Sequence, residues 1–190
     1  MSQDPARRAM AEKIGEALIE WSRIEHVWAN IFRDLLFGGI GERNKKDPET
    51  GALLDPGDSA EKSERADALF FAQKNSSHQF RLIKAVGSVT LSGEAGLLKH
   101  FEAVLKRTVQ LSEIRNSIAH AYYDNGLIVE GGKIEITPIQ MLNFGRFKRA
   151  PKVDISDAVN DFTVHATEVY AFWEKLLAFL PLAVSYSAAQ

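Results

Sequence analysis

Three residues near the middle of the chain combine a cation, an amide and an imidazole in one short segment: Arg115, Asn116 and His120. A histidine titrates near neutral pH, so it can take a proton from a reacting group or return one. An arginine is always charged and presents a rigid fork of N–H donors that suits phosphate oxygens. These residue types can therefore combine acid–base chemistry with stabilisation of negative charge on a phosphoryl group.

The segment ends a stretch in which apolar residues recur every three or four positions, as on the buried face of a helix. This row comprises Phe101, Val104, Leu111, Ile118 and Tyr122, with Thr108 in one slot. It predicts a helix from about Glu94 into His120, with Arg115 in the buried slot that follows Leu111. A buried guanidinium is costly unless a partner satisfies it. We therefore expect Arg115 to meet a buried carboxylate, or to face a cleft or a second subunit.

Helix geometry limits how these side chains can act together. At about 100° per residue, Asn116 and His120 share one face, whereas Arg115 and His120 lie roughly 140° apart. Arg115 and His120 can therefore converge only if His120 lies in a fraying last turn, or if a second subunit supplies one of them. Glu25 lies beside the apolar row of the first predicted helix and is the candidate carboxylate for Arg115. The pair is interpreted either as a structural contact or as one that orients the arginine.

Four helices are predicted to position this segment. The first begins with Asp4 as its cap and Pro5 in its first turn, and it ends at Gly38 and Gly39. The polar residues 41–57, with two Asp-Pro pairs, predict a surface loop.

The second predicted helix begins near residues 58–59 and ends at a break over 87–93, where the third helix follows. The fourth begins near residues 154–156 and is predicted to stop at Pro181, because proline cannot continue the hydrogen-bond ladder. Each helix carries one apolar face, as in a bundle.

A short β signal separates the third and fourth helices. Residues 127–130 and 133–136 flank Gly131 and Gly132, which is the spacing of a two-residue hairpin. The sequence thus predicts an all-α fold, an up-and-down four-helix bundle with a small β-hairpin insertion at 127–137. We expect one domain over residues 1–190.

Composition excludes several kinds of chemistry. The 190 residues carry a formal net charge of -2 and contain no cysteine, which excludes disulfides, thiolate zinc sites and a cysteine nucleophile. The spacing of a zinc or di-metal helix does not occur, so we expect no metal and no cofactor, and interpret the other histidines as surface or satisfied core residues. Neither a signal peptide nor an apolar stretch of membrane-spanning length occurs, so we expect no membrane contact and a cytoplasmic protein.

A basic stretch before the last helix is the second candidate for contact with an anion. Residues 144–152 include Arg146, Lys148 and Arg149 beside two phenylalanines and no acid. Such a loop can hold a phosphate backbone and stack a base, or it can be a solvated surface loop. RNA contact is the functional interpretation of these three residues.

The pattern Arg-Asn-x-x-Ala-His from Arg115 to His120, at the end of the penultimate helix of a small helical domain, resembles the HEPN superfamily. The resemblance implies a metal-independent endoribonuclease that cleaves single-stranded RNA as a homodimer, with the two motifs facing each other. It implies His120 as base or acid, Arg115 as the phosphate ligand, and Asn116 as a group that orients the imidazole or binds a phosphate oxygen. A toxin or defence role, restrained by an antitoxin protein, is implied as well.

Two other interpretations stay open. The chain can be a catalytically inactive HEPN-like module that binds a nucleotide, a nucleic acid or a protein, because a fold does not carry an activity by itself. It can also be a purely structural dimerisation bundle, in which Arg115 pairs with a buried carboxylate and His120 caps the helix C-terminus.

Overall fold

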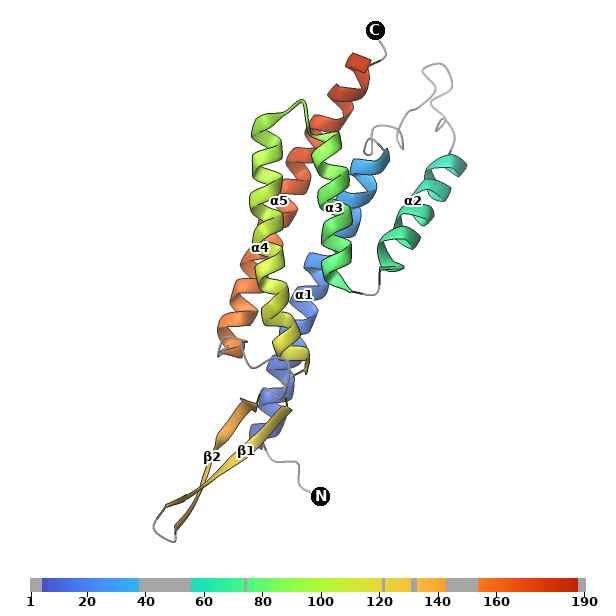
Figure 1. The fold of residues 1–190 in the computed structure, drawn as a ribbon. Helices are drawn as coiled ribbons and strands as arrows, with labels where there is room; N and C mark the ends of the chain where they lie inside the picture. The colour runs from blue at the N-terminus through green and yellow to red at the C-terminus, as the bar shows by residue number, and fades with distance from the viewer. Residues whose placement is uncertain are drawn as a thin grey trace. The chain divides into compact units, whose positions relative to one another are not determined.

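The computed structural model describes residues 5–37, 56–73, 75–120, 122–130, 133–142 and 154–187, with side chains at 5, 8–37, 61–73, 75–119 and 154–180. Its helices are α1 (Pro5–Phe37), α2 (Pro56–Phe71), α3 (Ser76–Thr90), α4 (Ala95–His120) and α5 (Ile155–Ser187) (Figure 1). Its strands are β1 (Tyr122–Glu130) and β2 (Lys133–Leu142). The helical class expected from the sequence is confirmed over this part of the chain. None of the described helices is both long and apolar enough to cross a bilayer.

The chain divides into two compact units, and three helices contribute to both. The first unit comprises Met1–Arg23 and Gln110–Val164, and the second comprises Ile24–Val109 and His165–Gln190. The first unit therefore contains the start of α1, the end of α4, both strands and the start of α5. The second unit contains the rest of these three helices together with α2 and α3.

The core of the second unit is built from aromatic rings on four helices. Trp28 of α1 packs against Phe101 of α4 and Phe172 of α5, with ring centroids 6.0 and 6.4 Å apart. Phe32, one turn further along α1, contacts Phe70 of α2 at 5.7 Å between centroids. The spacing of four residues puts Trp28 and Phe32 on one face of α1, and both side chains are buried.

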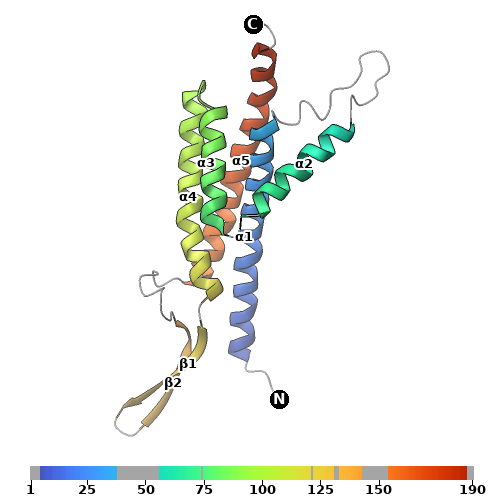
Figure 2. The same cartoon turned by 45° about the vertical axis from the view of Figure 1, so that its right-hand side comes forward.

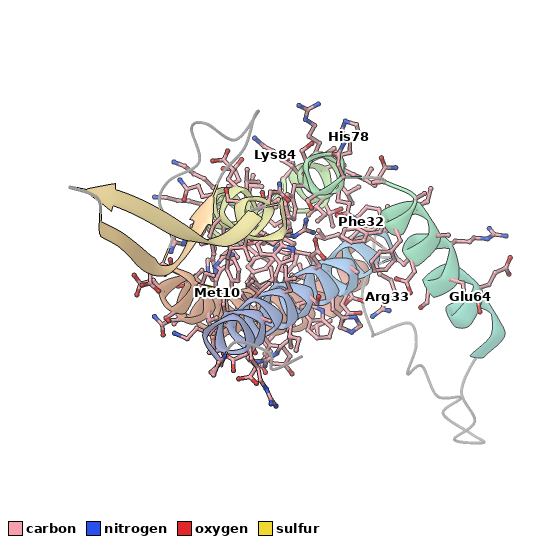
Figure 3. The ribbon with its side chains drawn as sticks, turned by 90° about the horizontal axis from the view of Figure 1, so that it is seen from below. Met10, Phe32, Arg33, Glu64, His78 and Lys84 are labelled. Atoms are coloured by element: carbon pink, nitrogen blue, oxygen red, sulfur yellow. The ribbon has the colours of Figure 1, made fainter. Side chains whose placement is uncertain are left out.

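The same unit separates apolar from charged side chains. Figure 3 shows Phe32 on the inner face of α1, whereas Glu64 of α2 and His78 and Lys84 of α3 point outward. Phe32 is buried and the other three side chains are exposed. This separation is what helices that bury one face against neighbours require.

The single helix predicted from residues 58–59 is two helices, which corrects the sequence analysis. α2 ends at Phe71 and α3 begins at Ser76, with Asn75 as its N-cap. The Asn75 side chain accepts a hydrogen bond from the backbone N–H of His78 at 2.9 Å. An asparagine that bonds the local backbone favours a new helix start over a continued helix, which explains the break.

A close approach of α3 and α4 explains the second difference from prediction. The two helices lie side by side in both views (Figure 1, Figure 2). Gly87, predicted to begin a break, lies inside α3, and a Cβ atom placed on it would be 2.3 Å from the ring of Phe101. Glycine stands inside this helix because the ring occupies the space of a side chain.

Other predicted boundaries also need correction. Pro56 and Gly57, predicted as loop, belong to α2, where a proline suits the first helical position. Pro181, predicted to stop the last helix, lies inside α5. Proline removes one backbone N–H and strains the preceding turn, but a helix can resume beyond it. Asp4, Gly38 and the rest of the predicted loop lie outside the described residues.

β1 and β2 pair antiparallel and are longer than the two runs read from the sequence. Their register shifts once, because β2 has one extra residue between the pairs Asn125–Ile139 and Leu127–Ile136. Pro138 lies in this bulge, where the ladder does not need its missing N–H.

We expect Gly87→Ala to lower the free energy of unfolding by about 1–3 kcal/mol, because the new methyl group must displace the Phe101 ring. The matched control is Gly96→Ala in α4, where an added Cβ meets nothing within 4 Å. This control should be neutral or stabilising by up to about 1 kcal/mol, because alanine is the better helix former. Urea unfolding of both variants measures the difference, and equal effects would contradict the packing of Phe101 on Gly87.

Asp154 should give folding a measurable pH dependence. Its Oδ1 accepts from the backbone N–H of Ser156 at 2.7 Å, and this bond and a second from the N–H of Asp157 lower the pKa of the carboxyl below its ordinary 3.8. A lowered folded-state pKa means that the stabilisation is present above pH 3.8 and is lost as the pH falls through the folded-state value. Asp154→Asn keeps a capping side chain that does not titrate, so its unfolding midpoint should change less between pH 5 and pH 2. Identical slopes for both proteins would show that this cap does not form.

Candidate functional site

Arg115 lies in the part of α4 that belongs to the first unit, and its guanidinium contacts an amide oxygen and an aromatic ring. Its Nη1 donates to Oδ1 of Asn116 at 2.9 Å. Its Cζ lies over the ring of Trp21, 5.6 Å from the ring centroid, which is within the range of a cation–π contact. The side chain is half-buried. The group is thus held by an aromatic face and an amide, a solution that the sequence analysis did not foresee.

Trp21 is itself fixed from a second direction. Its ring meets the ring of Phe162 from α5 edge to face, with centroids 5.5 Å apart and planes 64° apart. The tryptophan is only 1% exposed, which confirms that it is a core residue. Its Nε1 is buried and meets no acceptor among the residues that the structure describes. An unsatisfied buried donor costs about 1–3 kcal/mol, which offsets part of the stabilisation that burial of the ring provides.

We name Trp21, Arg115, Asn116 and Phe162 the Arg115 site. Its members come from the middle of α1, the end of α4 and the start of α5, and all four belong to the first unit. A half-buried cation with an aromatic support is suited to hold an anionic oxygen, because weak hydration strengthens a charge-assisted hydrogen bond. Only long-range packing brings Trp21 and Phe162 to Arg115, so helical periodicity alone could mark them as buried but not as neighbours of a cation.

Asn116 makes a contact that was not predicted, because its Oδ1 accepts from the Arg115 guanidinium. Its expected role, to orient the His120 imidazole or to bind a phosphate oxygen, stays a prediction. His120 is the last residue of α4, as predicted, and its side chain lies outside the described part of the chain. The convergence of Arg115 with His120 therefore stays a prediction.

The predicted pairing of Glu25 with Arg115 and the predicted RNA contact of the basic loop also stay predictions. Glu25 is half-buried in the second unit, where its Oε1 lies 3.5 Å from the hydroxyl oxygen of Ser76. Glu25 and Arg115 belong to different units, and their pairing is retained as an expectation. The basic residues of the predicted RNA-contacting loop lie outside the described residues, namely Arg146, Lys148 and Arg149.

A second polar cluster, which sequence reasoning missed, lies in the core of the second unit. The hydroxyl of Thr108 accepts from Nε1 of Trp28 at 2.9 Å, donates to the carbonyl of Val104 at 3.0 Å, and lies 2.7 Å from Nε2 of His165. Nδ1 of His165 lies 2.8 Å from Oε2 of Glu168. The only sequence signal was a threonine in an otherwise apolar row.

This cluster has the hydroxyl–imidazole–carboxylate order of a nucleophilic triad, but its burial assigns it to the core. Thr108 is 0% exposed and His165 is 1% exposed, so a substrate cannot reach the hydroxyl in this conformation. The network satisfies polar groups that would otherwise be costly inside the bundle. The interpretation of His165 as a satisfied core residue is confirmed.

The surroundings of His100 favour the neutral imidazole by lowering its pKa. Burial, aided by the nearby Lys175, lowers the pKa of His100 below its ordinary value of 6.5, although Glu168 acts in the opposite direction. Its ring packs edge-on against Phe172, with centroids 5.3 Å apart. Within the described residues, no cluster of three or more histidine, aspartate or glutamate side chains could hold a metal ion.

Comparison with known proteins does not assign the chain to a family. The chain matches no protein-family model, no curated protein and no solved structure. A function therefore has to be inferred from the residues of the Arg115 site and from the chemistry that they allow.

The two buried tryptophans of α1 provide a test of the unsatisfied indole. We expect Trp28→Phe to lower the free energy of unfolding by about 1–3 kcal/mol, because it removes the hydrogen bond to Thr108 and leaves a cavity. Trp21→Phe leaves a similar cavity but also removes an unsatisfied donor, so its cost should be smaller by about 1 kcal/mol. Urea unfolding measures both values. A Trp21→Phe loss as large as that of Trp28→Phe would mean that the Trp21 N–H has an acceptor.

Proposed function

We propose that the chain is a HEPN-type, metal-independent endoribonuclease that cleaves single-stranded RNA. The observation that supports this most is the Arg115 guanidinium, half-buried and braced by Trp21 and Asn116, five positions before a histidine that ends the same helix. A purely structural arginine needs no histidine at this spacing. A phosphodiester cleavage site needs both groups.

In the proposed reaction the ribose 2′-hydroxyl attacks its own 3′-phosphate. His120 takes the 2′-hydroxyl proton, O2′ bonds to phosphorus, and the bond from phosphorus to the 5′ oxygen breaks as that oxygen takes a proton from the protonated imidazole or from water. Arg115 stabilises the charge that grows on the non-bridging oxygens, where an ionised donor is strongest. The products are a 2′,3′-cyclic phosphate and a 5′-hydroxyl. Asn116 acts on Arg115 in this scheme, because its amide oxygen already holds the guanidinium.

We further propose that the site is completed by a second copy of the chain. On a straight helix Arg115 and His120 point roughly 140° apart, so one copy can supply the cation and the other the imidazole. The up-and-down four-helix bundle with its hairpin insertion, the pairing of Glu25 with Arg115, and RNA contact by Arg146 and its basic neighbours belong to the same proposal. So do a cytoplasmic toxin or defence role and restraint by an antitoxin protein.

A catalytically inactive HEPN-like binding module is the second candidate. It is favoured by the bond between Asn116 and Arg115, because a braced guanidinium can hold a phosphate group without any proton transfer. The two candidates differ in whether His120 matters, since binding needs the cation and cleavage needs the imidazole as well.

The purified protein should cleave a single-stranded oligoribonucleotide in the presence of EDTA. We expect His120→Ala and Arg115→Met each to lower the single-turnover rate at least about 100-fold, the usual contribution of a general acid or base or of one charge-stabilising donor. His78→Ala and Arg81→Met are matched controls, because both side chains are exposed and lie in the other unit.

The controls should cleave at the wild-type rate. Binding of the oligonucleotide without cleavage would favour the inactive module. Cleavage that needs a divalent ion, or that survives His120→Ala, would end the nuclease proposal in this form.

A further inference from the structure

The ring of Trp21 is the part of the Arg115 site that joins three helices. It stands on α1, it lies under the guanidinium of Arg115 from α4 at 5.6 Å, and it meets Phe162 from α5 at 5.5 Å between centroids. Phe162 packs against the ring and the tryptophan is only 1% exposed, so the indole is held in the core. Because the ring is held in place, it can restrict the conformations of a flexible side chain that packs on it.

Arginine needs such a support if it is to bind one anionic oxygen in a defined direction. Its side chain has many rotamers, and holding it in one of them costs conformational entropy. The Trp21 face fixes the distance of the guanidinium from the core, and the Asn116 oxygen fixes its rotation through Nη1. Because this order exists before any ligand arrives, binding an anion does not have to supply it.

The unsatisfied indole N–H points to the same role. A phenylalanine at this position would fill most of the same space without a buried donor that meets no acceptor among the described residues. Tryptophan is the strongest cation–π partner of the aromatic side chains. Compared with phenylalanine, tryptophan at this position adds an unsatisfied N–H and gives a stronger cation–π contact with Arg115.

We propose that Trp21 is a positioning residue of the Arg115 site, which prepares the guanidinium for a phosphodiester oxygen through its aromatic face. The ligand class rests on the proposed function, whereas the action of Trp21 through Arg115 does not require cleavage.

The experiment is a double-mutant cycle on binding and on cleavage. The four proteins are wild type, Trp21→Leu, Arg115→Met and the double variant; Trp21→Phe, which keeps a ring, serves if Trp21→Leu folds poorly. Affinity is measured with an oligodeoxyribonucleotide, which has phosphodiesters but no 2′-hydroxyl and so cannot react by the proposed route. The single-turnover rate is measured on the matching oligoribonucleotide. Trp28→Phe is the control for loss of core packing without contact to the site.

In the wild-type background we expect Trp21→Leu to weaken binding of the oligodeoxyribonucleotide about tenfold and Trp21→Phe about threefold. Losses of this size correspond to a less well positioned Arg115, not to removal of the group that contacts the ligand. In the Arg115→Met background neither change should matter, because Trp21 acts only through the guanidinium. Trp28→Phe should have the same effect in both backgrounds. Circular dichroism and urea unfolding establish that each compared protein is folded.

The possible outcomes distinguish the positioning role of Trp21 from the proposed nuclease activity. Equal losses from Trp21→Leu in both backgrounds would overturn the positioning role and leave the nuclease proposal standing. Binding that shows the expected coupling without any cleavage would overturn the nuclease and support the positioning role. The absence of both binding and cleavage would overturn both.

Discussion

The constraint on which the first unit depends is the presence of a guanidinium on the inner side of a helix. A charge in that place needs partners, and the chain provides the face of Trp21 and the amide of Asn116. The aromatic face and the amide oxygen together fix the guanidinium within the first unit.

In the second unit, a set of buried polar side chains is satisfied by hydrogen bonds between its members. Trp28 has its indole N–H bonded to Thr108, and the threonine continues through His165 to Glu168. Every member of this network has a partner, so it specifies the packing of α1, α4 and α5 without offering a reactive group to solvent. Trp21 differs, because these two tryptophans lie on the same side of α1, about two turns apart, and only Trp28 has its indole N–H hydrogen-bonded.

That contrast connects stability with function. Native interiors satisfy almost all of their polar groups, and the exceptions tend to be found where a protein does chemistry or binds a ligand. Two buried side-chain nitrogens of α1 have no hydrogen-bond partner among the described residues: Nε1 of Trp21 in the first unit and Nε of Arg33 in the second. The Trp21 ring lies next to Arg115, the residue that the sequence motif singles out on chemical grounds.

Helical periodicity predicted the helical class, one apolar face on each helix, and the place of Arg115, Asn116 and His120 at the end of a long helix. Periodicity is enough for these, because a helix that buries one face must repeat its apolar residues every three to four positions. It did not reveal the division of α2 from α3, which depends on Asn75 as a cap, or the passage of α5 through Pro181. Two contacts became visible only in the folded chain: the Phe101 ring fills the space beside Gly87, and the Arg115 guanidinium packs on the Trp21 ring. Contacts between residues far apart in the chain are set by how helices pack, and a local pattern carries no record of which faces will meet.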